Sequence, residues 1–419
     1  MTEDFLHYIW RFQALKPGPW KGTQGEVFKV IHPGYPNFDS GPDFQEARIS
    51  IDGQIWVGSV EIHISSKDWY QHKHQFDPAY NNVVLHVVYD SNVEVVNAQG
   101  NLIPELKLAS LFDEQLYWRF EQKLNKSAKL ACESSFPTSD RLHKQQMLDR
   151  CASLRLEERS TYIQKIYEEL HGDWDGLVYR LVARALGLKV NSEPMEMLAR
   201  VLPFSLWQKY LDRPQQRMAL FLGMSGILPS KGDAEVTKWA QEFQYLAHKH
   251  QLQAMDGSMW KYARMRPVSF PDRRIAQLAS IAPEILKWFR LIRNGKWSEI
   301  NWPSLDSYWT YHYRLNKVSA RKLSAKWSED RINILKINAL IPVLFFYARK
   351  VGNYNLQEKA LALLEEIPPE DNSISRSYEQ LGLTIGSAYD SQACITWYEY
   401  YCRPKKCLTC TLGNELLNT

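Results

Sequence analysis

The sequence predicts an α+β protein, with a small mixed β-sheet domain over residues 1–120 and an all-helical domain over 121–419. Three observations lead to this prediction. β-Type runs are confined to the first part of the chain, helical periodicity replaces them from about residue 116, and cysteines gather in a tail at 394–410. A chain of 419 residues also has the length of two domains.

The predicted sheet is built around one hairpin. Residues 47–51 alternate in polarity, Asp52-Gly53 is a strong type I′ turn signal, and 54–64 continues as a long strand. Because side chains alternate along a strand, Glu61 and His63 point to one face and Ile62 to the other. A helix up to about residue 10 is expected to pack on this domain.

The hairpin brings acidic side chains together. Asp43 precedes the first arm, so it is expected near Glu61 at the end away from the turn. Two converging carboxylates suit Mg²⁺ or Mn²⁺, which prefer oxygen ligands. The alternative is a pair of exposed acids at the end of a sheet. Glu26 is a weaker candidate for an additional acid.

Pro42-Asp43 followed by Glu61-Ile62-His63 resembles the signature of the PD-(D/E)XK nuclease superfamily, with His63 where those nucleases usually have Lys. The resemblance implies a restriction-endonuclease-like fold and hydrolysis of DNA or RNA, with Asp43 and Glu61 as metal ligands. A wider set resembles a bacterial family known only as a domain of unknown function. This set comprises Gly41 to Phe44, Gly58, Val60 to His63, Asp68-Trp69, His72, His74 and Asn82 to Val87.

Histidines offer a competing site. Four of the eleven in the chain lie close together in sequence, namely His63, His72, His74 and His86. His-x-His in an extended segment brings two imidazoles to one face, which is a usable Zn²⁺ pair. His86 interrupts an apolar strand and is therefore either hydrogen-bonded in the core or functional. A zinc hydrolase of a small substrate is thus an alternative to the nuclease, and a non-catalytic nucleic-acid-binding or scaffold protein is a third.

The remainder of the chain is predicted to be helical. Apolar residues recur at helical spacing in seven segments, at 145–170, 177–186, 193–202, 215–223, 234–249, 274–292 and 332–347. The sixth contains Pro283, where an interruption is possible. Between two helices, Lys261, Arg264, Arg266, Arg273 and Arg274 are mixed with aromatic residues. This segment is a candidate for phosphate contacts, but pairing of its arginines with nearby carboxylates is slightly favoured.

The cysteine tail is a candidate metal site. Cys402, Cys407 and Cys410 fall within nine residues, which in a chain without signs of secretion favours Zn²⁺ or a [4Fe–4S] cluster over disulfides. A fourth ligand is needed. Cys394 is near in sequence, yet a helix over 394–402 would separate the sulfurs by about 12 Å at ~1.5 Å per residue. Cys132 is therefore preferred. It resembles the remote cysteine of cluster-stapled PD-(D/E)XK nucleases, although there it precedes the nuclease motifs.

Composition narrows the location and partners only slightly. The net charge of +4 permits nucleic-acid binding without arguing for it. The N-terminus is acidic, unlike a signal peptide, and the longest apolar run, near residues 339–347, is too short to span a bilayer. A cytoplasmic location and no membrane association are expected.

Overall fold

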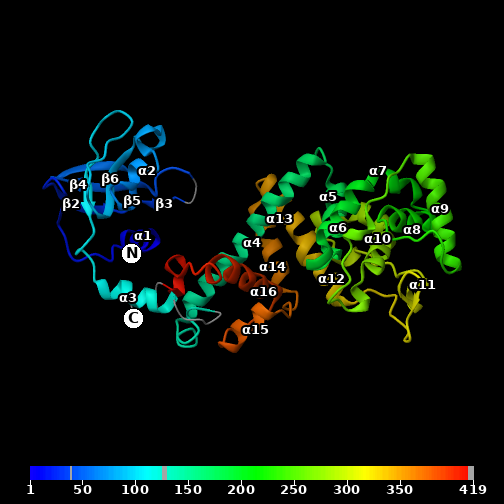
Figure 1. Cartoon of the computed structure of the whole chain (residues 1–419). Coiled ribbons are helices and arrows are strands. Elements are labelled where there is room, and N and C mark those ends of the chain that lie inside the picture. The colour runs from blue at the N-terminus through cyan, green and yellow to red at the C-terminus, as the bar shows by residue number, and fades with distance from the viewer. Residues whose placement is uncertain (38–39, 125–129, 414–419) are drawn as a thin grey trace. The chain divides into compact units, whose positions relative to one another are not determined.

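The structure is a computed structural model that describes residues 1–37, 40–124 and 130–413. The chain divides into two compact units (Figure 1). Unit 1 contains residues 1–149, 376–383 and 395–419, and unit 2 contains 150–375 and 384–394. The division differs from the expected boundary at 120, because the last part of the chain returns to the unit that holds the sheet.

Unit 1 contains a mixed, nearly closed sheet in the order β1-β2-β4-β5-β6-β7, with β3 pairing with β4. Pairs as far as β4–β5 are antiparallel, whereas β5–β6 and β6–β7 are parallel. Thr23 N–H donates to Glu105 O at 3.1 Å and so links the two edges of the sheet. The strands are β1 Trp20–Lys21, β2 Val27–His32, β3 Tyr35–Pro36, β4 Phe44–Ile51, β5 Gln54–Ser65, β6 Val83–Asp90 and β7 Glu105–Lys107.

The β4–β5 hairpin has the predicted turn. Asp52 and Gly53 have φ values of 50° and 86°, as a type I′ turn requires at both central positions. A bulge between Phe44 and Ala47 places Glu46 in the left-handed region at φ 57°. The register pairs Phe44 with Val60, so Asp43 lies beside the strand segment that carries Glu61.

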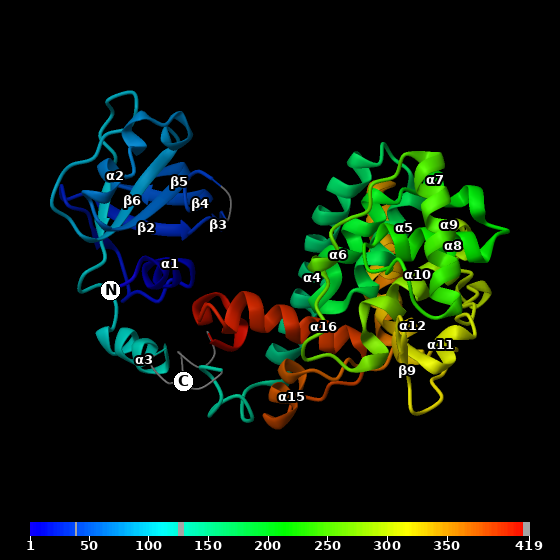
Figure 2. The same cartoon turned by 45° about the vertical axis from the view of Figure 1, so that its right-hand side comes forward.

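The two faces of the sheet have different covers. Helix α1 (Glu3–Arg11) buries Phe5, Leu6, Ile9 and Trp10 in the main apolar core of this unit, which also contains Ile62. Each such side chain stabilises the fold by roughly 1.5–3 kcal/mol. Short helix α2 (Asp68–Gln71) covers the opposite face, as Figure 2 shows. A separate small cluster there contains Trp69, Tyr80, Val83, Val95 and Ile103.

Helices dominate the rest of the chain, as predicted. All seven predicted helical segments are helical in the structure, and α10 continues through Pro283 without a break. The prediction missed the last three helices and the hairpin of β8 (His312–Arg314) and β9 (Lys317–Val318). The helices are α3 Glu114–Leu124, α4 Arg141–Glu169, α5 Trp174–Leu186, α6 Leu188–Val201, α7 Phe204–Trp207, α8 Pro214–Met224, α9 Ala234–His250, α10 Pro271–Arg293, α11 Tyr308–Tyr311, α12 Glu329–Leu335, α13 Ile341–Lys350, α14 Tyr354–Glu365, α15 Ser373–Gln380 and α16 Ala388–Trp397.

One helical stretch, Glu329–Lys350, is long and apolar enough to cross a membrane, but 61% of its apolar window is buried inside the protein. It contains a π-helical turn at Lys336–Leu340, just before Pro342. A proline cannot donate the backbone hydrogen bond of a regular helix, and the π-turn precedes that gap. The burial is that expected of a core helix.

Candidate metal centre

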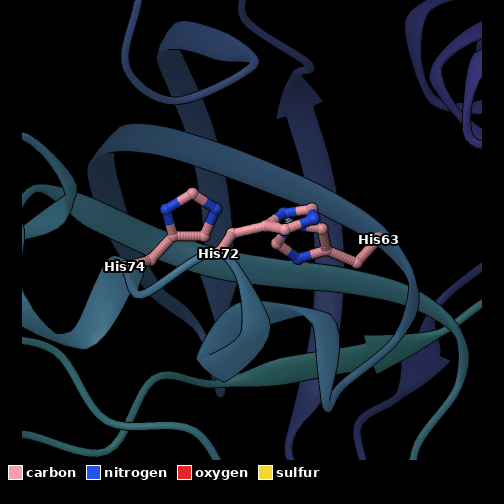
Figure 3. A group of neighbouring side chains, drawn as sticks. All are labelled: His63, His72 and His74. Atoms are coloured by element: carbon pink, nitrogen blue, oxygen red, sulfur yellow. Dashed lines mark hydrogen bonds between the residues drawn. The ribbon is translucent and has the colours of Figure 1, made fainter.

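Three histidines converge on the face of the sheet opposite α1. His63 is near the end of β5, while His72 and His74 follow α2, and one nitrogen of each lies within 4.8 Å of the other two (Figure 3). Lys73 between the latter two has φ 64°, a left-handed conformation that ends α2 and reverses the chain. This local turn lets both neighbours of Lys73 reach the same place, rather than the extended His-x-His that the sequence suggested.

Glu61 completes the group. His63 Nε2 lies 3.1 Å from His72 Nδ1 and 3.5 Å from Glu61 Oε1, and His74 Nε2 lies 3.3 Å from the same carboxylate oxygen. Ligands held at 2.0–2.1 Å around a tetrahedral ion are about 3.3 Å apart. The separations between these atoms are therefore those of atoms that share one ion.

His74 adds an unsatisfied nitrogen to this group. Its Nε2 is buried without a hydrogen-bond partner, although it lies close to Glu61. The ring is held by a stack on Tyr80 with centroids 3.8 Å apart and by the edge of Trp69 at 5.3 Å. Buried polar atoms normally have a partner, so a rigid, unsatisfied nitrogen at this position is well explained by a bound cation.

A chain of hydrogen bonds orients His63. Glu105 Oε2 lies 3.0 Å from His86 Nδ1, and His86 Nε2 lies 2.9 Å from His63 Nδ1. The carboxylate accepts a proton from His86 Nδ1, so Nε2 of a neutral His86 accepts from His63 Nδ1. The lone pair of His63 is thereby placed on Nε2, the atom that faces the other histidines. Metal-bound histidines are commonly oriented in this way by a carboxylate or carbonyl behind them.

The electrostatics of the group favour a cation. Burial, the charge of the nearby histidines and the absence of solvent lower the pKa of His63 to about 2, so the imidazole is neutral and able to bind a metal. Burial and the nearby charge of Asp43 raise the pKa of Glu61 to about 9. A divalent ion would offset both causes of the Glu61 shift.

Asp43 and Glu61 lie side by side through reciprocal contacts. Asp43 N–H donates to Glu61 Oε2 at 3.0 Å, and Ile62 N–H donates to Asp43 Oδ2 at 2.9 Å. His7 Nε2 on α1 lies 3.2 Å from Asp43 Oδ2. Burial alone would lower the pKa of His7, but the adjacent Asp43 carboxylate outweighs it and raises that pKa.

A cavity of about 180 Å³ lies next to His7 and Asp43. Its lining includes three fixed cations, Arg11, Lys405 and Lys406. The two lysines come from the C-terminal segment that belongs to unit 1. This arrangement suits an anionic ligand.

Several predicted residues have other surroundings. Glu26 accepts a hydrogen bond from Gln24 N–H in its own turn, which gives no support to a role beside Asp43. In the basic segment, Lys261, Arg264 and Arg266 are exposed. Nucleic-acid contact by Arg273 and Arg274 is a prediction to correct, because both side chains are buried.

The two buried arginines have structural partners. Arg273 donates to the backbone oxygens of Trp309 and Ser324. Arg274 donates to Gln277 Oε1 at 3.0 Å and to Ser269 Oγ at 3.2 Å. Burial lowers the pKa of Arg274 to about 9. A guanidinium in this setting holds the interior of the helical unit together and is not free to meet phosphate.

All six cysteines are free thiols. Burial raises the pKa of Cys402, the hydroxyl of Tyr378 at 3.2 Å opposes that shift, and the charges of Cys410, Cys132 and Cys407 add to it. The neighbours of Cys402 are therefore the three cysteines of the preferred set. Cys394 is buried on α16.

Sequence reasoning missed His7 and Glu105. His7 follows the apolar pattern of α1 and carries no local sign of a site. Glu105 is an acid inside a short strand, Glu105–Lys107, which was a usable signal because buried acids need partners.

The fold and this site define a protein in which a mixed, nearly closed sheet carries a histidine-rich candidate metal centre and is joined to a helical unit. The chain belongs to the family described as "Protein of unknown function (DUF2851)", which matches residues 3–373. No curated protein and no solved structure in the comparisons matches it. The family match confirms the resemblance to a family of unknown function, and it ends before the cysteine tail.

Proposed function

We propose that the sheet of unit 1 carries a zinc-dependent hydrolase site, with His63, His72 and His74 as ligands. The observation that supports this proposal most is the convergence of three imidazole nitrogens within 4.8 Å. Imidazole favours zinc and its neighbours in the first transition row, whereas Mg²⁺ prefers oxygen. Three protein ligands leave a coordination position for water or substrate, as in catalytic zinc sites.

Glu61 has the position of the general base in this proposal. Its Oε1 is near the ligand atoms of two histidines, while its Oε2 is held by Asp43 N–H. Zinc lowers the pKa of bound water to about 7, and a carboxylate at hydrogen-bond distance accepts its proton. The ion in turn stabilises the charged form of Glu61, which burial and Asp43 disfavour when no metal is bound.

The expected substrate is a phosphoester. Arg11, Lys405 and Lys406 line the cavity beside Asp43, and fixed cations stabilise the negative charge that develops on phosphoryl oxygens. His72 is exposed, so the metal is accessible to a substrate from solvent.

A second candidate is the PD-(D/E)XK-like nuclease, with a restriction-endonuclease-like fold and Mg²⁺ or Mn²⁺ bound by Asp43 and Glu61. The reciprocal backbone contacts of these two acids favour it, since they hold both carboxylates at adjoining positions of one hairpin. His63 would then replace the usual Lys. The two candidates share Glu61 and His63 but differ in whether His72 and His74 or Asp43 is the essential partner.

The test combines metal analysis with hydrolysis assays on the full-length protein. Zinc content is measured after purification, and the metal-free protein is assayed with Zn²⁺, Mn²⁺ or Mg²⁺. Substrates are chromogenic phosphate mono- and diesters, together with single- and double-stranded DNA and RNA. His72→Ala and His74→Ala are compared with His248→Ala, which removes an exposed histidine on α9.

We expect zinc-supported phosphoester hydrolysis that falls at least 100-fold in the first two variants and is unchanged in the third. Cleavage of nucleic acid that needs Asp43 but tolerates His72→Ala would favour the nuclease. Binding of nucleic acid without hydrolysis of any substrate would overturn both enzymatic proposals and favour a non-catalytic role.

A further inference from the structure

Four cysteines of unit 1 come from two distant parts of the chain. Cys402 ends a π-helical turn at Tyr398–Cys402, and Cys407 begins a short helix that Cys410 follows. Cys132 lies in a turn more than two hundred residues earlier in the sequence. The charges acting on Cys402 come from these three cysteines, which places all four sulfurs in one neighbourhood.

Aromatic packing holds the two segments together. Cys132 O accepts a hydrogen bond from Phe136 N–H at 2.8 Å, and the Phe136 ring packs on Tyr378 and Trp397 with centroids 5.8 Å away in both cases. The hydroxyl of Tyr378 in turn contacts Cys402 Sγ at 3.2 Å. The turn that carries Cys132 is thus anchored to the residue that contacts Cys402.

The tail itself is tightly folded around its cysteines. Cys410 N–H donates to Cys407 O at 3.1 Å, and Lys405 N–H donates to Cys402 O at the same distance. A Cβ on Gly413 would lie 1.9 Å from Cys407 O, so only glycine fits there. These contacts give the short tail a defined shape, with cysteines at its bends.

We propose that Cys132, Cys402, Cys407 and Cys410 form a closed zinc-thiolate site that is separate from the histidine centre. Four reduced thiols with no disulfide among them form the donor set of a structural zinc site. The site joins the end of the chain to the turn at Cys132 and closes the loop that carries Lys405 and Lys406. The metal assignment does not rest on the hydrolase proposal.

Cobalt substitution of the full-length protein tests this assignment. Tetrahedral Co²⁺ bound by thiolates has an intense sulfur-to-cobalt charge-transfer band in the near ultraviolet, which a histidine and carboxylate site lacks. Cys407→Ser is compared with Cys394→Ala and Cys151→Ala, which alter the two remaining cysteines. Zinc stoichiometry is measured for each protein and for His72→Ala.

We expect two zinc ions per wild-type chain, and one in both Cys407→Ser and His72→Ala. The charge-transfer band should be lost in Cys407→Ser and retained in His72→Ala, Cys394→Ala and Cys151→Ala. Retention of the band in Cys407→Ser, or its loss in Cys394→Ala, would overturn the ligand set. Iron with acid-labile sulfide in anaerobically purified protein would overturn the choice of zinc.

Thiol protection gives a second measurement that needs no variant. In the native zinc-loaded protein, we expect the four cysteines to resist alkylation and to react after a chelator removes the metal. Mass spectrometry of the peptides identifies which cysteines change. Equal alkylation of Cys402, Cys407 and Cys410 with and without chelator in zinc-containing protein would refute the proposal, even if Cys407→Ser fails to fold.

Discussion

Replacing Glu61 by Gln should stabilise the metal-free protein while weakening its response to metal. The pKa of Glu61 is about 9 in the folded state against an ordinary value of 4.5. Between these values the folded state holds a proton that the unfolded chain releases, so stability decreases as pH rises through this window. At pH 7.5 this linkage amounts to at most about 4 kcal/mol, at 1.36 kcal/mol per pH unit.

Gln resembles the protonated acid, retains the acceptor for Asp43 N–H and cannot ionise. Because the surroundings relax, we expect metal-free Glu61→Gln to be more stable than wild type by on the order of 2 kcal/mol at pH 8. The difference should nearly vanish at pH 5. Added Zn²⁺ should reverse the order, since it stabilises the wild type more than the variant.

The assay is urea unfolding in the presence of chelator or Zn²⁺ at pH 5 and pH 8, following the transition that Zn²⁺ shifts. Glu94→Gln, which alters an exposed carboxylate of the same unit, is the control and should show no such pH dependence. The reasoning fails if metal-free Glu61→Gln is less stable than wild type at pH 8. It also fails if Zn²⁺ stabilises both proteins equally.

Three further predictions follow from the site and its support. Glu105→Gln leaves every proposed ligand in place but weakens the orientation of His63, so zinc affinity measured by competition with a chromogenic chelator should fall about 10–100-fold. Trp69→Ala should lower the free energy of unfolding by about 3–5 kcal/mol, because the ring is fully buried against the site; a loss below 1 kcal/mol would contradict that packing. Arg273→Ala should destabilise the helical unit in thermal unfolding, and an unchanged melting temperature together with weaker nucleic-acid binding would restore the interface hypothesis.

Local patterns predicted the hairpin and most helices well. The Asp52-Gly53 turn, the alternation that pairs Glu61 with His63, and the seven helical segments all depend on residues within a few positions of one another. Such features are set by backbone conformation and by periodic burial, both of which are written in the order of side chains. The hairpin register also brought Asp43 close to Glu61.

The metal centre depended on contacts that no local pattern contains. The left-handed conformation of Lys73 turns His72 and His74 toward His63, and Glu105 reaches His86 only because β7 pairs with β6. Burial likewise gave Arg273 a structural role that its basic neighbourhood did not indicate.

By itself, the sequence determined the class of fold, the face of β5 that carries acid and imidazole, and the chemical types of donor available to a metal. Only the tertiary structure decided which donors meet, because their convergence depends on strand pairing across the sheet and on a chain reversal at a single residue. It also decided which charged groups are buried. Burial and long-range proximity set pKa values and metal-ligand geometry, and neither is a property of neighbouring residues in the chain.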